Sequence, residues 1–301
     1  MNVRKAVIVA AGLGTRMLPA SKVIPKEILP VVDKPALQVV VEEAAASGIE
    51  EIVLVLSPNR TIGLEHFQPA PELERLLELR GKHDLLASLR QTNQLARFTA
   101  AWQDQPLGLG HAVLQAREAV GNEPFAVMLP DDIFDSERPC LRQLLDVSEA
   151  EDAPAVALMR VAMSEIPKYG IVDVKPARPH LYELRGMVEK PAAEEAPSDF
   201  AIVGRYVLTP DIFDLLAGGK PGAGGEIQLT DGLLELNKRR RMFGYEFEGT
   251  RYDLGDRLGY LTAQIGFGLK RSELAGSLRG WLRIALGADE PVSSSRELKK
   301  R

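Results

Sequence analysis

The chain has 301 residues, and 45% of them are hydrophobic, which is enough to bury one large core or two modest ones without a metal or disulfide framework. A net charge of -5 argues against binding of nucleic acid through bulk electrostatics, because phosphate backbones select basic faces. Cys140 is the only cysteine and the four histidines are scattered, which excludes an intramolecular disulfide and does not indicate a zinc cluster. We expect an ordinary globular protein of the cytoplasm.

The apolar runs of the chain are short. The first, at residues 6–11, is too short for a secretory signal or a membrane span, and no targeting signal is visible around it. Later runs have the length of strands and are interrupted by charges. We therefore expect neither a transmembrane segment nor a membrane partner, and no nucleic-acid partner.

Strand and helix patterns alternate in the first half. Continuous apolar runs at residues 6–11, 52–56, 125–129 and 155–158 are typical of strands covered on both faces. Pro35 is expected to open a helix that Gly48 ends. The apolar stripe of this helix consists of Leu37, Val40, Val41, Ala44 and Ala45. The repeated unit predicts a Rossmann-like α/β fold, with a mixed, mostly parallel sheet flanked by helices and ligands bound beyond the carboxyl ends of strands.

The second half is less regular. We expect a strand at residues 184–188, a glycine-rich turn at 218–225 and a helix at about 226–239. An apolar helix at about 274–286, which carries Trp281, could pack on another subunit or on the chain's own core. Residues 289–301 form a polar, basic tail that we expect to be flexible.

A glycine loop follows the first predicted strand, with the sequence Ala11-Gly12-Leu13-Gly14-Thr15-Arg16. Its two glycines allow backbone amides to approach an anion closely, although a tight strand-to-helix turn would use them equally well. A dinucleotide fingerprint requires a third glycine where Met17 stands, and a P-loop requires a glycine, a lysine and a hydroxyl residue in succession. The loop therefore predicts a phosphate site of another kind.

The segment from Arg16 to Pro35 interleaves prolines with lysines, so it can hold cations at fixed distances from a triphosphate with little ordering cost. It resembles the signature of the nucleotide-diphospho-sugar pyrophosphorylases, GxGTRxxP followed by PKExLPVxxKP. Further motifs of that superfamily recur in order: Gln103 to Ala112, Leu129-Pro130-Asp131-Asp132, Glu189-Lys190-Pro191, Val203-Gly204-Arg205-Tyr206, Gly224 to Asp231, and Tyr252 to Asp256. From Val3 to about Leu286, the chain is similar to the bacterial UTP–glucose-1-phosphate uridylyltransferases.

This resemblance implies a Mg²⁺-dependent transfer of the uridylyl group of UTP to glucose 1-phosphate, which gives UDP-glucose and pyrophosphate. It implies one nucleotidyltransferase domain over residues 1–288, with a nucleotide-binding part at about 1–135 and a sugar-binding part at about 136–288. It also implies a homodimer or homotetramer. Transfer of a thymidylyl or cytidylyl group, and a non-catalytic domain that binds a sugar nucleotide, are the alternatives.

The resemblance also assigns roles to individual residues. The catalytic residues are Arg16, Lys26 and Lys190, and the Mg²⁺ ligands are Asp131 and, from the far side of the cleft, Asp253. The nucleotide-binding residues are Ala11, Gly12, Gly14, Glu27, Gln103 and Gly108. The sugar-binding residues are Gly170, Glu189, Lys190, Val203 and Gly204.

Elementary chemistry supports several of these roles. Asp131 directly follows a predicted strand, where a carboxylate can hold Mg²⁺ against a triphosphate, although a helix cap would use the same residue. Lys190 can offset a phosphate charge while Glu189 accepts hydrogen bonds from sugar hydroxyls. The amide of Gln103 can pair with a pyrimidine edge, whereas Gly170 and Gly204 suit a simple turn equally well. Residues 59–102 depart from the usual family sequence, which leaves the subunit contacts open.

Overall fold

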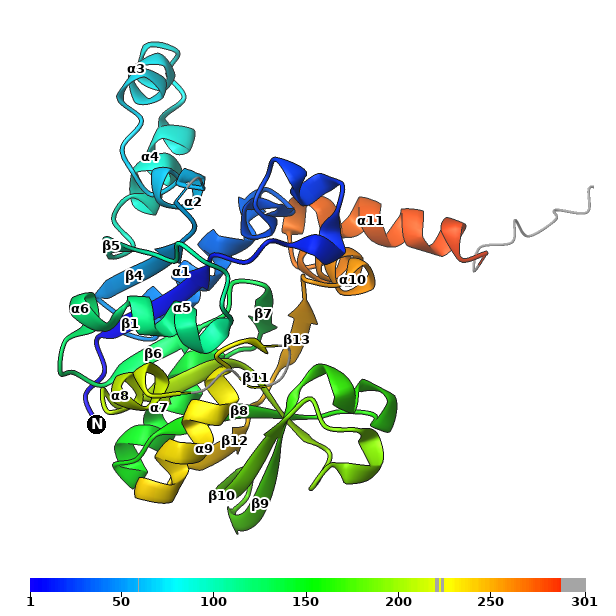
Figure 1. The fold of residues 1–301 in the computed structure, drawn as a ribbon. Coiled ribbons are helices and arrows are strands. Elements are labelled where there is room, and N and C mark those ends of the chain that lie inside the picture. The colour runs from blue at the N-terminus through cyan, green and yellow to red at the C-terminus, as the bar shows by residue number, and fades with distance from the viewer. Residues whose placement is uncertain (59, 220–221, 223–224, 288–301) are drawn as a thin grey trace, which may run out of the picture.

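The computed structural model describes residues 1–58, 60–219, 222 and 225–287. Its centre is a mixed sheet with the strand order β5-β4-β1-β6-β11-β8-β12-β10-β9 (Figure 1). In that order the strands are β5 (Arg97–Trp102), β4 (Glu51–Leu56), β1 (Lys5–Ala10), β6 (Phe125–Met128), β11 (Phe200–Leu208), β8 (Ala155–Arg160), β12 (Phe243–Glu246), β10 (Leu181–Glu189) and β9 (Gly170–Arg178). Parallel pairing joins β5, β4, β1 and β6, and also β8 with β12.

The expectation of a mostly parallel sheet holds only for the first half of the chain. There each strand returns through a helical crossover, as parallel pairing requires. In the second half, β11 runs antiparallel to β6, β8 and β9, and β9 and β10 form a hairpin. The fold is therefore α/β with a mixed sheet.

Helices cover both faces of the sheet (Figure 1). They are α1 (Ala36–Ala46), α2 (Ile62–Glu65), α3 (Pro71–Leu79), α4 (His83–Thr92), α5 (Leu109–Gln115), α6 (Arg117–Val120), α7 (Cys140–Glu151), α8 (Ile212–Ala217), α9 (Leu229–Arg239), α10 (Arg257–Gly268) and α11 (Ser272–Ala285). Short 3₁₀ helices are η1 (Thr15–Met17), η2 (Ala20–Lys22), η3 (Lys26–Ile28), η4 (Met163–Lys168) and η5 (Ala193–Glu195). None of the helices in the described part of the chain has the length and hydropathy needed to cross a membrane.

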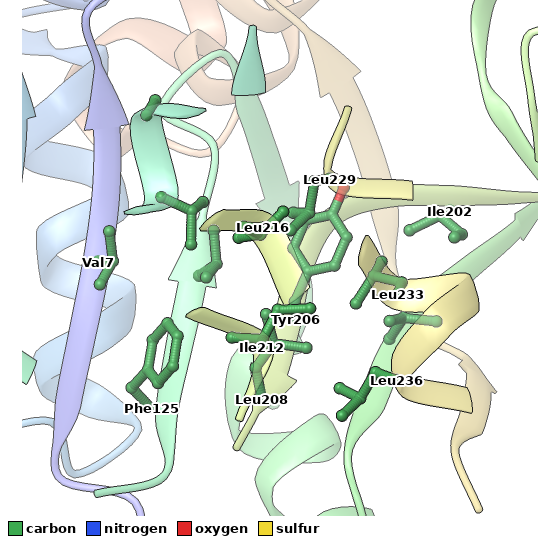
Figure 2. Close-up of a cluster of buried hydrophobic side chains, with 14 of the residues drawn as sticks. Val7, Phe125, Ile202, Tyr206, Leu208, Ile212, Leu216, Leu229, Leu233 and Leu236 are labelled. Atoms are coloured by element: carbon green, nitrogen blue, oxygen red, sulfur yellow. The ribbon is translucent and has the colours of Figure 1, made fainter. Parts of the chain in front are cut away.

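The alternation of strand side chains divides the core into two layers. Val7 of β1 packs with α5, α8 and α9 on one face, whereas its neighbours Ala6 and Ile8 pack with α1 and α7 on the other. Figure 2 shows the first layer, in which Tyr206 of β11 lies among leucines of α8 and α9, and Phe125 of β6 lies on the side of Val7. Buried side chains thus pack on both faces of the sheet.

Two small sheets complete the edge that carries the functional loops. β2 (Pro30–Val31) pairs with β3 (Lys34–Pro35), and β7 (Asp132–Asp135) pairs with β13 (Thr250–Asp253). In the second of these sheets, Asp253 lies opposite Asp132. The β7–β13 pair therefore brings Asp253, at the end of β13, beside the loop that follows β6.

Most predicted boundaries agree with the structure within a few residues. The strand predicted at 184–188 is the end of β10, and the helix that follows Pro35 ends before Gly48, whose φ is 95°. The helix expected from 226 begins later, as α9 at Leu229, because Gln228 is extended. Part of the predicted turn at 218–225 and the tail at 289–301 lie outside the described residues.

The helix predicted at 274–286 is α11, which extends away from the body of the molecule (Figure 1). None of its residues is buried, and the exposed fraction of Trp281 is 62%. Of the two alternatives, packing on the chain's own core is therefore wrong for this helix.

Candidate active site

Two cavities open side by side at the carboxyl ends of the parallel strands. The loop cavity, of about 430 Å³, is lined by the glycine loop after β1, by Lys26 and by Gln103 after β5. The charged cavity, of about 260 Å³, is lined by Arg16, Lys190 and residues of β9, β11 and β13. Both share a wall that consists of Leu109, Leu129, Asp131 and Glu226. Asp131 and Glu226 are thus the carboxylates that both cavities reach.

Backbone geometry shapes the loop cavity. Gly14 has a φ of 65° before η1, and Gly108 has a φ of 106° before α5, values that side chains rarely allow. A Cβ atom on Gly108 would lie 2.7 Å from the carbonyl oxygen of Ile227, so only glycine fits there. Ala11 and Gly12 also line this cavity, as the sequence predicted for a phosphate or base site.

Gln103 lies directly after β5, and its exposed fraction is 7%. Its Nε2 atom donates to the carbonyl oxygen of Gly108 at 3.1 Å and lies 3.1 Å from Nδ1 of His111. His111 stands in α5, so this amide connects the two ends of the motif Gln103 to Ala112. The sequence pointed to Gln103 but not to His111.

Lys26 and Asp131 form a close ion pair. Both line the loop cavity, and Asp131 belongs to the wall that the two cavities share. Burial opposes ionisation of Asp131, but the charge and hydrogen bond of Lys26 hold its pKa below the usual value. Burial likewise lowers the pKa of Lys26, and Asp131 more than offsets this, so the ammonium stays charged. A cation and an anion therefore lie paired where the two cavities meet, and each neutralises the other.

The position of Gly255 shows how the carboxylates are arranged in the charged cavity. A Cβ atom there would lie 3.0 Å from Oδ1 of Asp253, 3.1 Å from Oδ2 of Asp131 and 2.6 Å from Nη2 of Arg16. The two carboxylate oxygens are consequently no more than about 6 Å apart. The amide of Leu254 donates to the carbonyl oxygen of Asp131 at 2.7 Å, which fixes their two segments together.

This donor set fits a hard divalent cation such as Mg²⁺. Within the described ranges, no three His, Cys, Asp or Glu side chains gather into a complete metal cage. Mg²⁺ commonly needs only one or two carboxylates, because substrate phosphates and water supply the remaining oxygen ligands. Asp131 and Asp253 meet that requirement, and they do so as neighbours through the β7–β13 pair rather than across the cleft.

Lys190 follows β10 in a left-handed backbone conformation, with a φ of 47°. Such a conformation is costly for a lysine and requires support, which the bond from its amide to the carbonyl oxygen of Tyr169 at 3.0 Å provides. Its ammonium is half-exposed and lies 3.3 Å from Oε1 of Glu189. Glu189 also accepts a hydrogen bond of 2.6 Å from Thr230, and a Cβ atom on Gly170 would lie 2.9 Å from that hydroxyl.

A buried network of charges holds the loop that carries Asp131. Arg205 is fully buried and pairs with Glu43, and it donates to the carbonyl oxygens of Leu129, Gly204 and Asp132 at 3.0–3.2 Å. These carbonyls flank Asp131 on one side and the bend of β11 on the other. Arg205 therefore holds the backbone on both sides of Asp131 in place.

Arg251 of β13 extends this network into the charged cavity. It pairs with the buried carboxylate of Asp132, lies 3.5 Å from Oδ2 of Asp253, and donates to the hydroxyl of Tyr169 at 3.1 Å. Burial raises the pKa of Asp132 to about 6, although the charge of Arg251 opposes this. The arginine thereby links the carboxylates to the loop that precedes Gly170.

Comparison with known proteins identifies this arrangement. Residues 5–266 match the family described as Nucleotidyl transferase. A UTP–glucose-1-phosphate uridylyltransferase of Bacillus subtilis (strain 168) is 46% identical over 289 residues, which cover 96% of this chain and 99% of the relative. The chain belongs to this family.

Solved structures agree with the sequence comparison. A UDP-glucose pyrophosphorylase in complex with UDP-glucose is 41% identical and has a TM-score of 0.82, with coverage of 90% of this chain and all of that one. The UTP-bound enzyme of Acinetobacter baumannii is 39% identical and has a TM-score of 0.86, with coverage of 93% of this chain and 99% of that one. Fold and family membership therefore agree over nearly the whole chain.

Within this family member, most residues predicted for the site line one of the two cavities. Ala11, Gly12, Gly14, Lys26, Gln103 and Gly108 line the loop cavity. Arg16, Gly170, Glu189, Lys190, Gly204 and Asp253 line the charged cavity, and Asp131 lines both.

Two predicted residues line neither cavity. The side chain of Glu27 is buried, with an exposed fraction of 2%, because neighbouring residues of the 3₁₀ turn point in different directions and Lys26 takes the cavity side. Val203 packs into a small core cluster with Phe134, because strand alternation sends it away from the cavity that Ile202 and Gly204 face.

The sequence-based prediction missed Arg205, Arg251 and Thr230. Arg251 had a usable signal, since it precedes Asp253 by two residues and therefore lies on the same face of a strand. Arg205 and Thr230 lie inside matched motifs, but the motif does not show that Arg205 pairs with Glu43, which is 162 residues away along the chain.

Proposed function

We propose that the chain transfers the uridylyl group of UTP to glucose 1-phosphate, producing UDP-glucose and pyrophosphate with Mg²⁺ as cofactor. The observation that carries this proposal is the shared wall at Asp131, where a cavity built from glycine backbone meets one built from charged side chains. A nucleotide in the loop cavity and a sugar phosphate in the charged cavity would present their phosphates to each other at that wall. The relatives named for these substrates support the assignment.

The proposed step is an in-line displacement at phosphorus. A phosphate oxygen of glucose 1-phosphate attacks the α-phosphorus of UTP, a new P–O bond forms, and the bond from the α-phosphorus to the oxygen of the leaving pyrophosphate breaks. The nucleophile is already an anion, so no general base is needed. Catalysis then consists of aligning two polyanions and stabilising the charge that develops on the leaving group.

The residues divide this work according to their place in the cavities. Lys26 and Arg16 would neutralise the triphosphate and the departing pyrophosphate, while Lys190 would hold the acceptor phosphate in line. Asp131 and Asp253 would hold Mg²⁺, which would supply positive charge to neutralise the substrate phosphates. When UTP binds, the ammonium of Lys26 would leave Asp131 and pair with the phosphates.

Recognition of the remaining groups follows the same division. Glu189, oriented by Thr230, would accept hydrogen bonds from glucose hydroxyls, with Gly170 and Gly204 leaving room for the ring. Gln103, Gly108 and the backbone of Ala11 and Gly12 would hold the base and ribose. The division into a nucleotide-binding part at about 1–135 and a sugar-binding part at about 136–288 is proposed on these grounds.

The proposal includes a cytoplasmic homodimer or homotetramer. A lone, buried thiol at Cys140 fits a reducing compartment. The exposed apolar side chains of Trp281, Ile284 and Leu286 on and just after α11 support an association of subunits. Sedimentation of the purified chain measures the oligomeric state directly.

The decisive experiment measures pyrophosphate release from UTP, CTP, dTTP and ATP, each combined with several sugar 1-phosphates. We expect the pair of UTP and glucose 1-phosphate to give the highest kcat/KM, and chelation of Mg²⁺ to abolish turnover. A preference for dTTP or CTP would establish one of the alternative transfers. Tight binding of a sugar nucleotide without turnover would establish the non-catalytic alternative.

A further inference from the structure

The amide of Gln103 is held in one orientation by the carbonyl oxygen of Gly108 and faces a ring nitrogen of His111. Its Nε2 atom donates to the carbonyl oxygen of Gly108 and faces Nδ1 of His111, each at 3.1 Å. The carbonyl of Gly108 is itself fixed, because it also accepts the first helical hydrogen bond of α5 from Ala112 at 3.1 Å. Turning the amide end for end would bring two oxygen atoms together at Gly108.

This orientation determines which atom of Gln103 meets a ligand. Both hydrogens of Nε2 are used inside the protein, which leaves Oε1 as the free acceptor. Oε1 takes no hydrogen bond from any described residue, and it is not among the fully buried polar atoms that lack a partner. Since Gln103 lines the loop cavity, Oε1 is the polar atom that it offers there.

His111 can support this orientation only in one protonation form. A neutral imidazole has a single acceptor nitrogen, and the ring meets amide nitrogens on both sides, since Gln115 Nε2 lies 3.2 Å from Nε2 of His111. Gln103 is buried, whereas Gln115 is half-buried and already donates from Nε2 to the backbone carbonyl oxygen of His111 at 3.1 Å, so its remaining hydrogen can turn toward water. The acceptor is therefore assigned to Nδ1, with the proton on Nε2.

We propose that His111 is a positioning residue that selects the base, by holding the oxygen of the Gln103 amide toward the loop cavity. This inference rests on the proposed function, which makes that cavity the nucleotide site. The edge of uracil presents an N3–H donor between two carbonyl oxygens, and that donor suits a fixed acceptor. Cytosine presents a lone pair at N3 and would be opposed by the same oxygen.

The same hydrogen bond also limits which bases His111 can help to distinguish. A methyl group at C5 does not alter the hydrogen-bonding edge of uracil, so Oε1 cannot distinguish uracil from 5-methyluracil. His111 therefore governs selection against cytosine and leaves selection against the methylated base unchanged. A general loss of packing around α5 would not separate the two.

The test compares two variants that differ in one acceptor. His111→Leu removes the acceptor at Nδ1, whereas His111→Asn places an amide at that position and can restore it by presenting its oxygen. We expect His111→Leu to lower the ratio of kcat/KM for UTP over CTP by about tenfold, as the loss of one orienting hydrogen bond implies. His111→Asn should keep the ratio within about threefold of the starting chain. Both variants should retain the starting ratio for UTP over 5-methyl-UTP.

Several results would overturn the proposal. An unchanged UTP over CTP ratio in His111→Leu would remove His111 from base selection, as would an equal loss in both ratios or a failure of His111→Asn to rescue. Thermal unfolding of each variant shows whether the fold is kept, and if His111→Leu is unfolded, His111→Gln, which shifts the amide toward the Nε2 position, replaces it. Should the unaltered chain release no pyrophosphate with any substrate pair, the proposed function fails, and calorimetric affinities for UTP, 5-methyl-UTP and CTP still test His111.

Discussion

The two cavities at the sheet edge are built in different ways. The loop cavity is shaped by glycine backbone, and among the described residues that line it only Lys26, Asp131 and Glu226 carry charge. The charged cavity is lined by many ionisable side chains, among them Arg16, Glu189, Lys190, Arg251 and Asp253. Backbone suits a flat base and its ribose, while mobile charged side chains must be held in place before they can align phosphates.

The residues behind the two cavities differ as well. The loop cavity inherits its shape from local turns such as those at Gly14 and Gly108. The charged cavity depends on a scaffold of buried ions, in which Arg205 and Arg251 join segments far apart in the sequence. We therefore expect substitutions in the scaffold to damage folding, and substitutions in either cavity to affect substrates selectively.

The largest expected effect is on stability, from Arg205→Met. The substitution leaves the carboxylate of Glu43 without its cation and removes one donor from each of three carbonyl oxygens, so we expect a loss of about 3–5 kcal/mol in the free energy of unfolding. Urea denaturation measures it. The double variant with Glu43→Gln should recover part of the loss, because glutamine still accepts from the Leu141 amide without a buried charge. A loss below about 1 kcal/mol in Arg205→Met would show that the network does not support the fold.

The next effect concerns the wall that both cavities share. Asp131→Asn should reduce turnover at least about a hundredfold with the fold intact, since it removes an anionic metal ligand and little volume. Because Asp131 serves both cavities, the loss should appear at saturation with either substrate. Steady-state kinetics over a range of Mg²⁺ concentrations test this, with exposed Asp84→Asn on α4 as the control. Turnover near that of the starting chain would make the metal assignment wrong.

Lys190→Ala separates the two cavities. The lysine meets the acceptor phosphate in the ground state and keeps it in line during attack, so KM for glucose 1-phosphate should rise, kcat should fall, and kcat/KM should drop by about thirtyfold. Calorimetric affinity for UTP should change little, because Lys190 does not line the loop cavity. Lys175→Ala, on the exposed part of β9, is the matched control. Loss of UTP affinity with an unchanged KM for glucose 1-phosphate would reverse the division of the cleft.

The sequence predicted the parts of this molecule that depend on neighbours in the chain. The buried strands, the helix that Gly48 ends and the glycine loop all have local patterns, and they agree with the structure. The sequence predicted a mixed sheet but not which strands run antiparallel, because strands such as β11 carry no local mark of their pairing direction. Motif matches found most cavity residues, since the motifs lie where strands end.

What the sequence could not provide is the direction of individual side chains and the identity of distant partners. Val203 and Gly204 are adjacent, yet only Gly204 lines a cavity. The burial of Arg205 depends on Glu43, and the adjacency of Asp131 and Asp253 depends on the β7–β13 pair. These contacts depend on packing between residues that are far apart in the sequence, and a short motif does not predict them.

The smallest expected effect concerns Glu27, which tests whether the loop cavity also rests on buried charge. Burial raises the pKa of Glu27 to about 7, against the opposing influence of Lys26 and Arg60, and its Oε2 atom is buried with no hydrogen-bond partner among the described residues. A carboxyl group whose pKa is higher in the folded than in the unfolded chain stabilises fully below about pH 4.5, and loses this contribution as the pH rises through about 7. Glu27→Gln does not titrate, so its unfolding free energy relative to the starting chain should rise between pH 5 and pH 8 by about 1–2 kcal/mol. Urea denaturation at both pH values measures the difference, and exposed Glu72→Gln on α3 should give the same value at both. If the difference for Glu27→Gln falls or stays flat with pH, Glu27 is ionised in the folded chain, and the contrast between a backbone-built cavity and a charge-built one would have to be abandoned.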